Sequence, residues 1–197
     1  MHWSKVGFAA LDFETTGLGP DDTVVSFGVV PVLDGRIALG GSVYRTVSLA
    51  SELSVPSIVV HGLLPRDLAD SPPMQQILPT LRGALEGRFL LTWAAEVEAA
   101  FLAQLFGGAS GRWLRRSVDV LGLAILADRL EGRQPGQGDY ALTSAAERAG
   151  VAVEQPHHAF DDALTTAQLF LILADRLSHE GFDTPRRLIG AGSTGRR

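Results

Sequence analysis

The stretch that decides the fold is Val6-Gly7-Phe8-Ala9-Ala10-Leu11-Asp12-Phe13-Glu14-Thr15-Thr16-Gly17-Leu18, an apolar run that ends in two acids and a turn. Residues 6–13 are apolar almost throughout, which predicts a central strand covered on both faces. Asp12 and Glu14 are two positions apart, so in a strand their side chains point to the same face. Val6, Phe8 and Ala10 continue that face and are expected in the core.

Two neighbouring carboxylates at the end of an apolar row repel each other and are costly to remove from water. A hard divalent cation such as Mg²⁺ or Mn²⁺ removes both problems, because it prefers oxygen ligands. Asp12 and Glu14 are therefore candidate metal ligands. The alternative interpretation is a frayed strand end with two solvated acids.

The rest of the chain has the pattern of a mixed α/β domain. Two β-rich runs, 23–32 and 36–47, are joined by the hairpin signal Asp34-Gly35, so three antiparallel strands open the domain. A loop is expected over 53–73, a short strand over 88–92, and breaks at 107–111 and 131–138. Helical spacing predicts helices over 74–86, 94–106, 118–130, 142–149 and about 160–178, and we expect disorder from Gly190 onward.

Glu98 is the third acid of interest. In the predicted helix over 94–106 it shares a stripe with Phe101, Leu102 and Leu105, whereas Glu96 lies on the solvent side. An acid on an apolar stripe usually has a partner. Metal or water coordination is one interpretation, and a buried ion pair with an arginine is the other.

The stretch Gln155-Pro156-His157-His158-Ala159-Phe160-Asp161-Asp162-Ala163 is the most informative one after the opening strand. His157 and Asp162 are five apart, so at about 100° per residue they cannot share a helix face. They converge only if His157 lies in the loop before the helix and Asp162 in its first turn. A histidine placed there can take a proton from water. Asp161 is the better helix-capping candidate and Asp162 the better ligand.

Bulk composition places the chain among globular proteins. Its 197 residues suit one domain, and 46% are hydrophobic. It has no cysteine, which excludes disulfides and thiolate metal sites. The net charge of −5 argues against broad charge-driven binding to long duplexes, although bound cations would reverse the sign locally. No signal peptide or membrane span is recognisable, so we expect a soluble, cytoplasmic protein.

Two of these stretches resemble motifs of the DnaQ-like, or DEDDh, 3′→5′ exonucleases, a family that includes the proofreading epsilon subunit of bacterial DNA polymerase III. The first motif, Asp-x-Glu-Thr-Thr-Gly, matches residues 12–17, and the third, His-x-Ala-x-x-Asp-Ala, matches 157–163. Weaker signatures lie between them in the expected order, at 61–63, 72–73, 118–121 and 142–150. The resemblance implies an α/β ribonuclease H-like fold with a mixed five-stranded sheet flanked by helices. It suggests an exonuclease domain over 1–180 and a C-terminal extension over 181–197.

The resemblance also implies roles for individual residues. Two divalent cations would be held by Asp12, Glu14 and Asp162, with Glu98 at the periphery, and His157 would be the general base. Thr15 and Leu18 would contact the terminal nucleotide, and His61 would line the cleft. His158 is a competing base candidate. The second motif departs from the family, since Trp93-Ala94 replaces a His-Asn pair and Glu98 replaces an Asp.

The function expected from this resemblance is metal-dependent removal of 5′-mononucleotides from the single-stranded or frayed 3′ end of DNA or RNA, with DNA repair as one setting. A polymerase or other protein partner is not identified by the sequence. One alternative is a catalytically weakened module that binds nucleic acid or protein, which the altered second motif favours. Others are an exonuclease of RNA or oligoribonucleotides, and a hydrolase of a non-nucleic phosphoester.

Overall fold

The central strand is β1 (Phe8–Thr15), as the opening stretch predicts, and every other strand is arranged around it. This computed structural model describes residues 1–49, 55–133, 136 and 139–195. The sheet order is β3-β2-β1-β5-β6, with β4 also pairing with β2. β2 (Val24–Leu33) is antiparallel to β1, whereas β5 (Phe89–Thr92) is parallel to it. The carboxyl ends of β1 and β5 therefore meet at one edge.

The third antiparallel strand, predicted as one run over 36–47, is interrupted. β3 (Arg36–Ile37) and β4 (Val43–Thr46) both pair with β2, and the 3-10 turn η2 (Leu39–Gly41) separates them. Pro31 of β2 faces the gap with its carbonyl, which accepts the Ala38 N–H at 2.9 Å. Proline has no N–H for the ladder at that point, and Gly40-Gly41 is a poor strand sequence. In the described residues the sheet therefore has six strands where five were expected, because β3 and β4 share one edge of β2; the predicted mixed sheet is confirmed.

The last strand was predicted wrongly as the start of a helix. β6 (Ser117–Asp119) pairs in parallel with β5, and α6 (Val120–Leu130) begins only after it. Asp119 ends the strand and caps the helix, because its Oδ1 accepts the Gly122 N–H at 3.0 Å. The predicted helix over 118–130 is thus a strand end and a helix joined through one capping residue.

Other helices occur both where they were predicted and where loops were expected. The segment predicted as a loop over 53–73 contains α1 and α2, and the predicted break at 107–111 contains the start of α5. The remaining bounds are η1 (Trp3–Lys5), α1 (Val55–His61), α2 (Pro65–Leu68), α3 (Met74–Leu85), α4 (Ala95–Phe106), α5 (Ser110–Leu114), α7 (Leu142–Arg148), α8 (Ala159–Ser178) and α9 (Pro185–Gly195). In the described part of the chain, no helix combines the length and apolar composition needed to cross a membrane.

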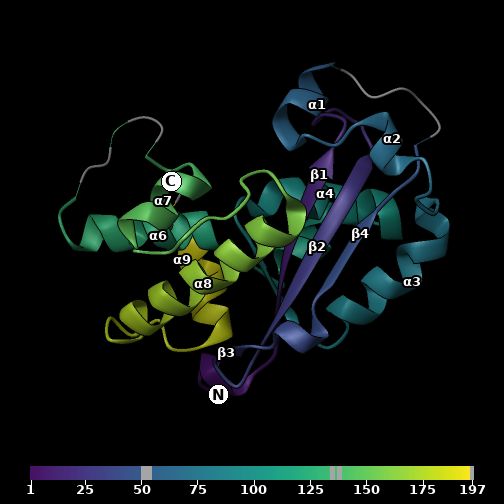
Figure 1. Cartoon of the computed structure of the whole chain (residues 1–197). Helices are drawn as coiled ribbons and strands as arrows, with labels where there is room; N and C mark the ends of the chain where they lie inside the picture. The colour runs from purple at the N-terminus through teal and green to yellow at the C-terminus, as the bar shows by residue number, and fades with distance from the viewer. Residues whose placement is uncertain (50–54, 134–135, 137–138, 196–197) are drawn as a thin grey trace.

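Helices cover both faces of the sheet (Figure 1), and each face has its own hydrophobic core. On one face Phe8 and Ala10 pack with apolar residues of α6, α8 and α9. On the other, Ala9 and Leu11 pack with residues of α3 and α4. The alternation along β1 is the expected one for a doubly covered strand. Asp12 and Glu14 thus continue the row that faces α8.

The C-terminal helix corrects the expectation of disorder from Gly190. Residues 190–195 form the second half of α9, which packs on α6 and β6. The contact is main chain to main chain, since a Cβ added to Gly122 would lie 1.8 Å from the Gly192 carbonyl oxygen. Glycines that weaken an isolated helix here permit close packing. Residues 196–197 lie outside the described part, and the domain boundary at residue 180 stays a prediction.

Candidate active site

Three carboxylates meet at the edge where β1 ends. One ligand oxygen from each of Asp12, Glu14 and Asp162 lies within 4.8 Å of the others. Asp12 and Glu14 come from β1, and Asp162 comes from the first turn of α8. The predicted convergence of the first and last motifs is therefore present in the structure.

The approach of α8 to the sheet depends on Gly28 of β2. Gly28 is the register partner of Asp12, so it lies beside the site on the same face. A Cβ on Gly28 would lie 2.2 Å from the Ala159 carbonyl oxygen, which leaves no space for a side chain. The first turn of α8 therefore rests directly on the strand. This contact brings Asp162 to the acids of β1, and an isolated glycine inside a strand pattern is the signal that could have indicated it.

Burial raises the pKa values of all three acids, and repulsion from neighbouring carboxylates adds to it. Burial, followed by the charge of Asp162, raises the pKa of Glu14 to about 8. Burial raises the pKa of Asp12 well above its ordinary value, and the charges of Glu98, Glu14 and Asp162 add to this. Burial also raises the pKa of Asp162, although the His157 N–H opposes the shift. In the protein alone, these groups cannot all be ionised at neutral pH.

The same donor set fits a divalent cation. All three residues offer carboxylate oxygens, which Mg²⁺ and Mn²⁺ prefer over nitrogen or sulfur. Oδ1 of Asp162 is buried and accepts no hydrogen bond from the described residues. A positive ion at this point would satisfy that oxygen and remove the repulsion that raises the pKa values.

Glu98 lies next to this cluster without belonging to it. It is buried in the first turn of α4, and Glu96 is exposed, as their helix positions predict. The charge of Glu98 is the largest electrostatic contribution to the raised pKa of Asp12. The three-carboxylate group with ligand atoms within 4.8 Å does not include Glu98. This placement agrees with a peripheral role, which stays a prediction.

His157 lies in the turn before α8, as the spacing to Asp162 requires. Its backbone is left-handed, with φ of +63°, a conformation that is uncommon outside glycine. Its N–H donates to Oδ2 of Asp162 at 3.1 Å. The side chain is exposed, so water can reach the imidazole. Asp162 thus holds the histidine-bearing turn beside the carboxylates.

His158 has a different environment, which sequence reasoning did not identify. It is the N-cap residue of α8, and its Nδ1 lies 2.8 Å from Oδ2 of Asp161. Its ring packs on Tyr44 of β4, with centroids 4.4 Å apart. Asp161 therefore pairs with a side chain and is not the helix cap that we expected. Tyr44 was missed because its place beside the site follows from strand pairing, through its register partner Gly28.

The predicted substrate-binding residues lie in three settings. The Thr15 hydroxyl donates to the Gly17 carbonyl at 2.8 Å and so shapes the turn after β1. Leu18 is 75% exposed on that turn. His61 ends α1 and is buried, and its Nδ1 accepts the Leu63 N–H at 3.0 Å. Burial lowers the pKa of His61, which favours a neutral ring. Contacts of these residues with a nucleotide stay predictions.

Comparisons with known proteins agree with this geometry. The family model described as an exonuclease, RNase_T, matches residues 9–170. A PolC-type DNA polymerase III of Thermotoga petrophila is 30% identical over 176 residues, which are 88% of this chain and 12% of the polymerase. The chain thus spans only a small part of that relative.

Solved structures share the fold. Escherichia coli exonuclease I in complex with a dT13 oligonucleotide superimposes with a TM-score of 0.75 at 16% identity, over 89% of this chain and 42% of that one. The nuclease domain of 3′hExo, a DEDDh family member bound to rAMP, gives 0.67 at 18% identity, over 90% and 94%. The predicted ribonuclease H-like architecture is confirmed. With a family model that covers residues 9–170 and the family's acids at one strand edge, this chain belongs to the RNase_T exonuclease family.

Proposed function

We propose that this protein is a 3′→5′ exonuclease that hydrolyses the terminal phosphodiester of single-stranded DNA and releases a 5′-mononucleotide. The observation that carries the proposal is the approach of Asp12, Glu14 and Asp162 to within 4.8 Å of one another. Among the residues that the structure describes, no lysine, arginine or histidine forms an ion pair with any of these three acids. They suit a reaction in which negative charge grows on phosphate oxygens beside bound cations.

The three carboxylates would hold the divalent cations, Mg²⁺ or Mn²⁺, with Glu98 at the periphery. Bound there, such ions supply Lewis-acid stabilisation of the phosphate and of the leaving oxygen. His157 takes the proton of the attacking water as the oxygen of that water bonds to phosphorus. The bond from phosphorus to the 3′ oxygen breaks, and that oxygen takes a proton from solvent. Asp162 also orients the base, because it accepts the His157 N–H.

Thr15, Leu18 and His61 would form the nucleotide-binding surface. Leu18 is exposed beside the strand end, so its side chain is available to pack against the terminal base. Thr15 fixes the turn that carries Leu18. Choice between DNA and RNA depends on how this surface treats the 2′-OH. Relatives whose names include polymerase suggest a polymerase as a protein partner.

The experiment is digestion of a 5′-labelled 20-nucleotide strand of DNA, with a matched RNA strand in parallel. We expect a ladder that shortens from the 3′ end in Mg²⁺ or Mn²⁺ and disappears in EDTA. Asp12→Asn is the matched control, since it keeps the side-chain shape and removes the charge. Absence of metal-dependent shortening of both strands by the wild-type protein would contradict the proposal. Shortening of RNA alone would reassign the substrate.

A further inference from the structure

A second concentration of charge, opposite in sign, lies at the other end of the sheet. Arg82 of α3, Arg112 of α5 and Arg116, which precedes β6, line a cavity of about 240 Å³. The cavity opens near the amino ends of β5 and β6, whereas the carboxylates lie where β1 ends. Phe8 pairs with Phe89, and Glu14 lies six positions after Phe8 in β1, so the two sites are at least roughly 20 Å apart along the strands.

The three guanidinium groups of this arginine pocket are held by aromatic rings. Arg82 lies 4.9 Å from the centre of the Phe106 ring, and Arg112 lies 5.9 Å from that of Trp113. Arg116 also contacts Trp113 and donates to the backbone carbonyls of Leu85 and Arg88. Such contacts orient a guanidinium without neutralising it. The pocket therefore presents oriented, charged donors.

The positive charge of the arginine pocket is not compensated. Of the described residues that line it, Glu86 is the one acid, set against three arginines. Within residues 1–49, 55–133, 136 and 139–195, no ion pair joins Arg82, Arg112 or Arg116 to an acid. The uncompensated charge is noteworthy in a chain of net charge −5.

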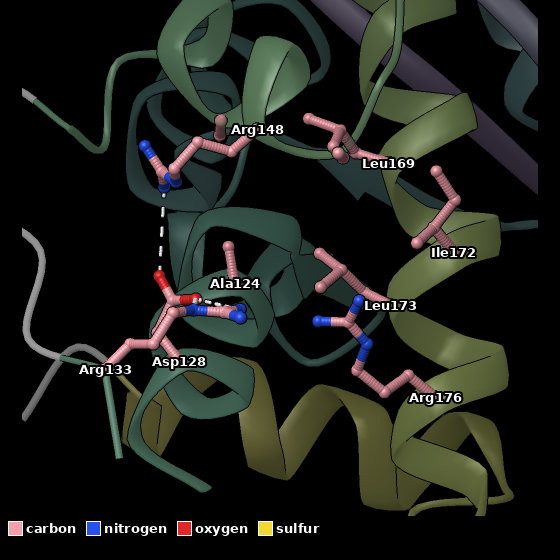
Figure 2. A pocket seen from close by; sticks show the side chains of 10 residues that line it. Ala124, Asp128, Arg133, Arg148, Leu169, Ile172, Leu173 and Arg176 are labelled. Atoms are coloured by element: carbon pink, nitrogen blue, oxygen red, sulfur yellow. Dashed lines mark hydrogen bonds and ion pairs between the residues drawn. The ribbon is translucent and has the colours of Figure 1, made fainter. Parts of the chain in front are cut away.

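A second pocket provides the contrast (Figure 2). It also contains three arginines, Arg133, Arg148 and Arg176, and lies between α6, α7 and α8. There Asp128 pairs with Arg133 at 2.6 Å and with Arg148 at 3.8 Å, and Arg176 pairs with Glu131 at 2.8 Å. Each of these three arginines is thus ion-paired with an acid of the same chain. In the arginine pocket, Arg116 is hydrogen-bonded to backbone carbonyls, but in the described part of the chain no acid is ion-paired with Arg82, Arg112 or Arg116. Their positive charge therefore remains available for an external anion.

We infer that the arginine pocket binds a phosphate group of a single-stranded nucleic acid, upstream of the terminus that the carboxylates act on. Guanidinium groups match phosphate oxygens in geometry and charge. Trp113 is buried, so the pocket offers little surface for base stacking and is expected to ignore sequence. At ~3.4 Å per stacked nucleotide, at least about six nucleotides separate the two sites. The choice of ligand rests on the proposed function.

The test uses Arg82→Ala/Arg112→Ala, which removes two exposed charges and keeps Arg116 and the rings. The matched control is Arg129→Ala/Arg186→Ala, two exposed arginines of α6 and α9 with the same change in net charge. Binding of a fluorescent 20-nucleotide DNA strand is measured in EDTA, so this readout does not require hydrolysis. We expect Kd to rise about tenfold in the pocket variant. The slope of log Kd against log salt should fall by about 0.7, the change expected for the loss of one phosphate contact on a single strand.

Two further measurements distinguish a defect in the arginine pocket from a defect in the active site or in folding. Hydrolysis of a trinucleotide, too short to reach the pocket, should be unchanged in the pocket variant, whereas KM for the 20-nucleotide strand should rise. Arg82→Lys/Arg112→Lys should restore most of the binding. Equal Kd for the pocket variant and the wild type would overturn the inference and favour an acidic protein segment as ligand. If the wild-type protein hydrolysed neither the trinucleotide nor the 20-nucleotide strand, the proposed function would be contradicted instead.

Discussion

Two sets of buried acids in this protein have similar burial and opposite surroundings. Asp128 is 4% exposed, and Glu14 and Asp162 are 7% and 8% exposed. Arg133 and Arg148 surround Asp128 (Figure 2), whereas Glu14 and Asp162 face a further carboxylate, Asp12. Burial of an acid is therefore not what marks a functional site. The distinguishing feature is whether the fold itself supplies the opposite charge.

The largest expected effect is that of substituting Asp162, an acid for which the described part of the fold supplies no arginine. Asp162→Asn should lower the rate of hydrolysis by roughly 10³-fold or more, because a cation ligand is lost. The melting temperature in EDTA should not fall, since the change removes repulsion and the amide oxygen can still accept the His157 N–H. Rate and thermal melting are measured on the same preparation. A fall in melting temperature that accounts for the lost rate would mean that Asp162 is structural, like Asp128.

A second pair of substitutions tests which of the two histidines beside the carboxylates is the general base. His157→Ala should lower the rate by about 10²–10⁴-fold, the usual contribution of a general base. His158→Ala should cost less, because His158 is paired with Asp161 and packed on Tyr44. Single-turnover rates of both variants decide between them. Full activity of His157→Ala together with loss in His158→Ala would reverse the assignment.

The carboxylate site also predicts a dependence of stability on pH in the metal-free protein. Because the pKa of Glu14 is raised to about 8, the folded state holds a proton that the unfolded state has lost. The stabilising contribution of protonated Glu14 is then fully present below its pKa in the unfolded state, near 4.5, and is lost as pH rises through 8. Between pH 5.5 and 8.5, the free energy of unfolding of the wild type should fall by about 2–3 kcal/mol more than that of Glu14→Gln. Urea unfolding in EDTA measures it, and parallel pH profiles for both proteins would contradict it.

The smallest expected effect is that of substituting Asp128, the acid that is paired with arginines. Asp128→Asn should lower the free energy of unfolding by about 1–2 kcal/mol, since its charged hydrogen bonds to Arg133 are weakened. Hydrolysis by the folded fraction should be unchanged. Urea unfolding and initial rates at 20 °C test the two statements separately. A lowered rate in fully folded protein would place Asp128 in the catalytic machinery and remove the contrast.

The sequence predicts the acid site better than it predicts its surroundings. The period of two along β1 places Asp12 and Glu14 on one face, and helix geometry places His157 in a turn. The strand β6 was missed because three residues carry no period, and its burial comes from β5 and α9. Tyr44, Gly28 and the pairing of His158 with Asp161 depend on how α8 lies on the sheet. That arrangement is set by contacts between residues far apart in the chain.

The seating of α8 on Gly28 has a consequence for ion selectivity. Helix and strand touch through backbone atoms, so no rotamer change can widen the gap between Asp162 and β1. An ion of larger radius would have to be accommodated by rotation of the carboxylates alone. Ca²⁺ requires bonds of about 2.3–2.6 Å, compared with about 2.0–2.1 Å for Mg²⁺. We therefore expect this glycine, which coordinates nothing itself, to act as a rigid spacer that favours small ions over large ones.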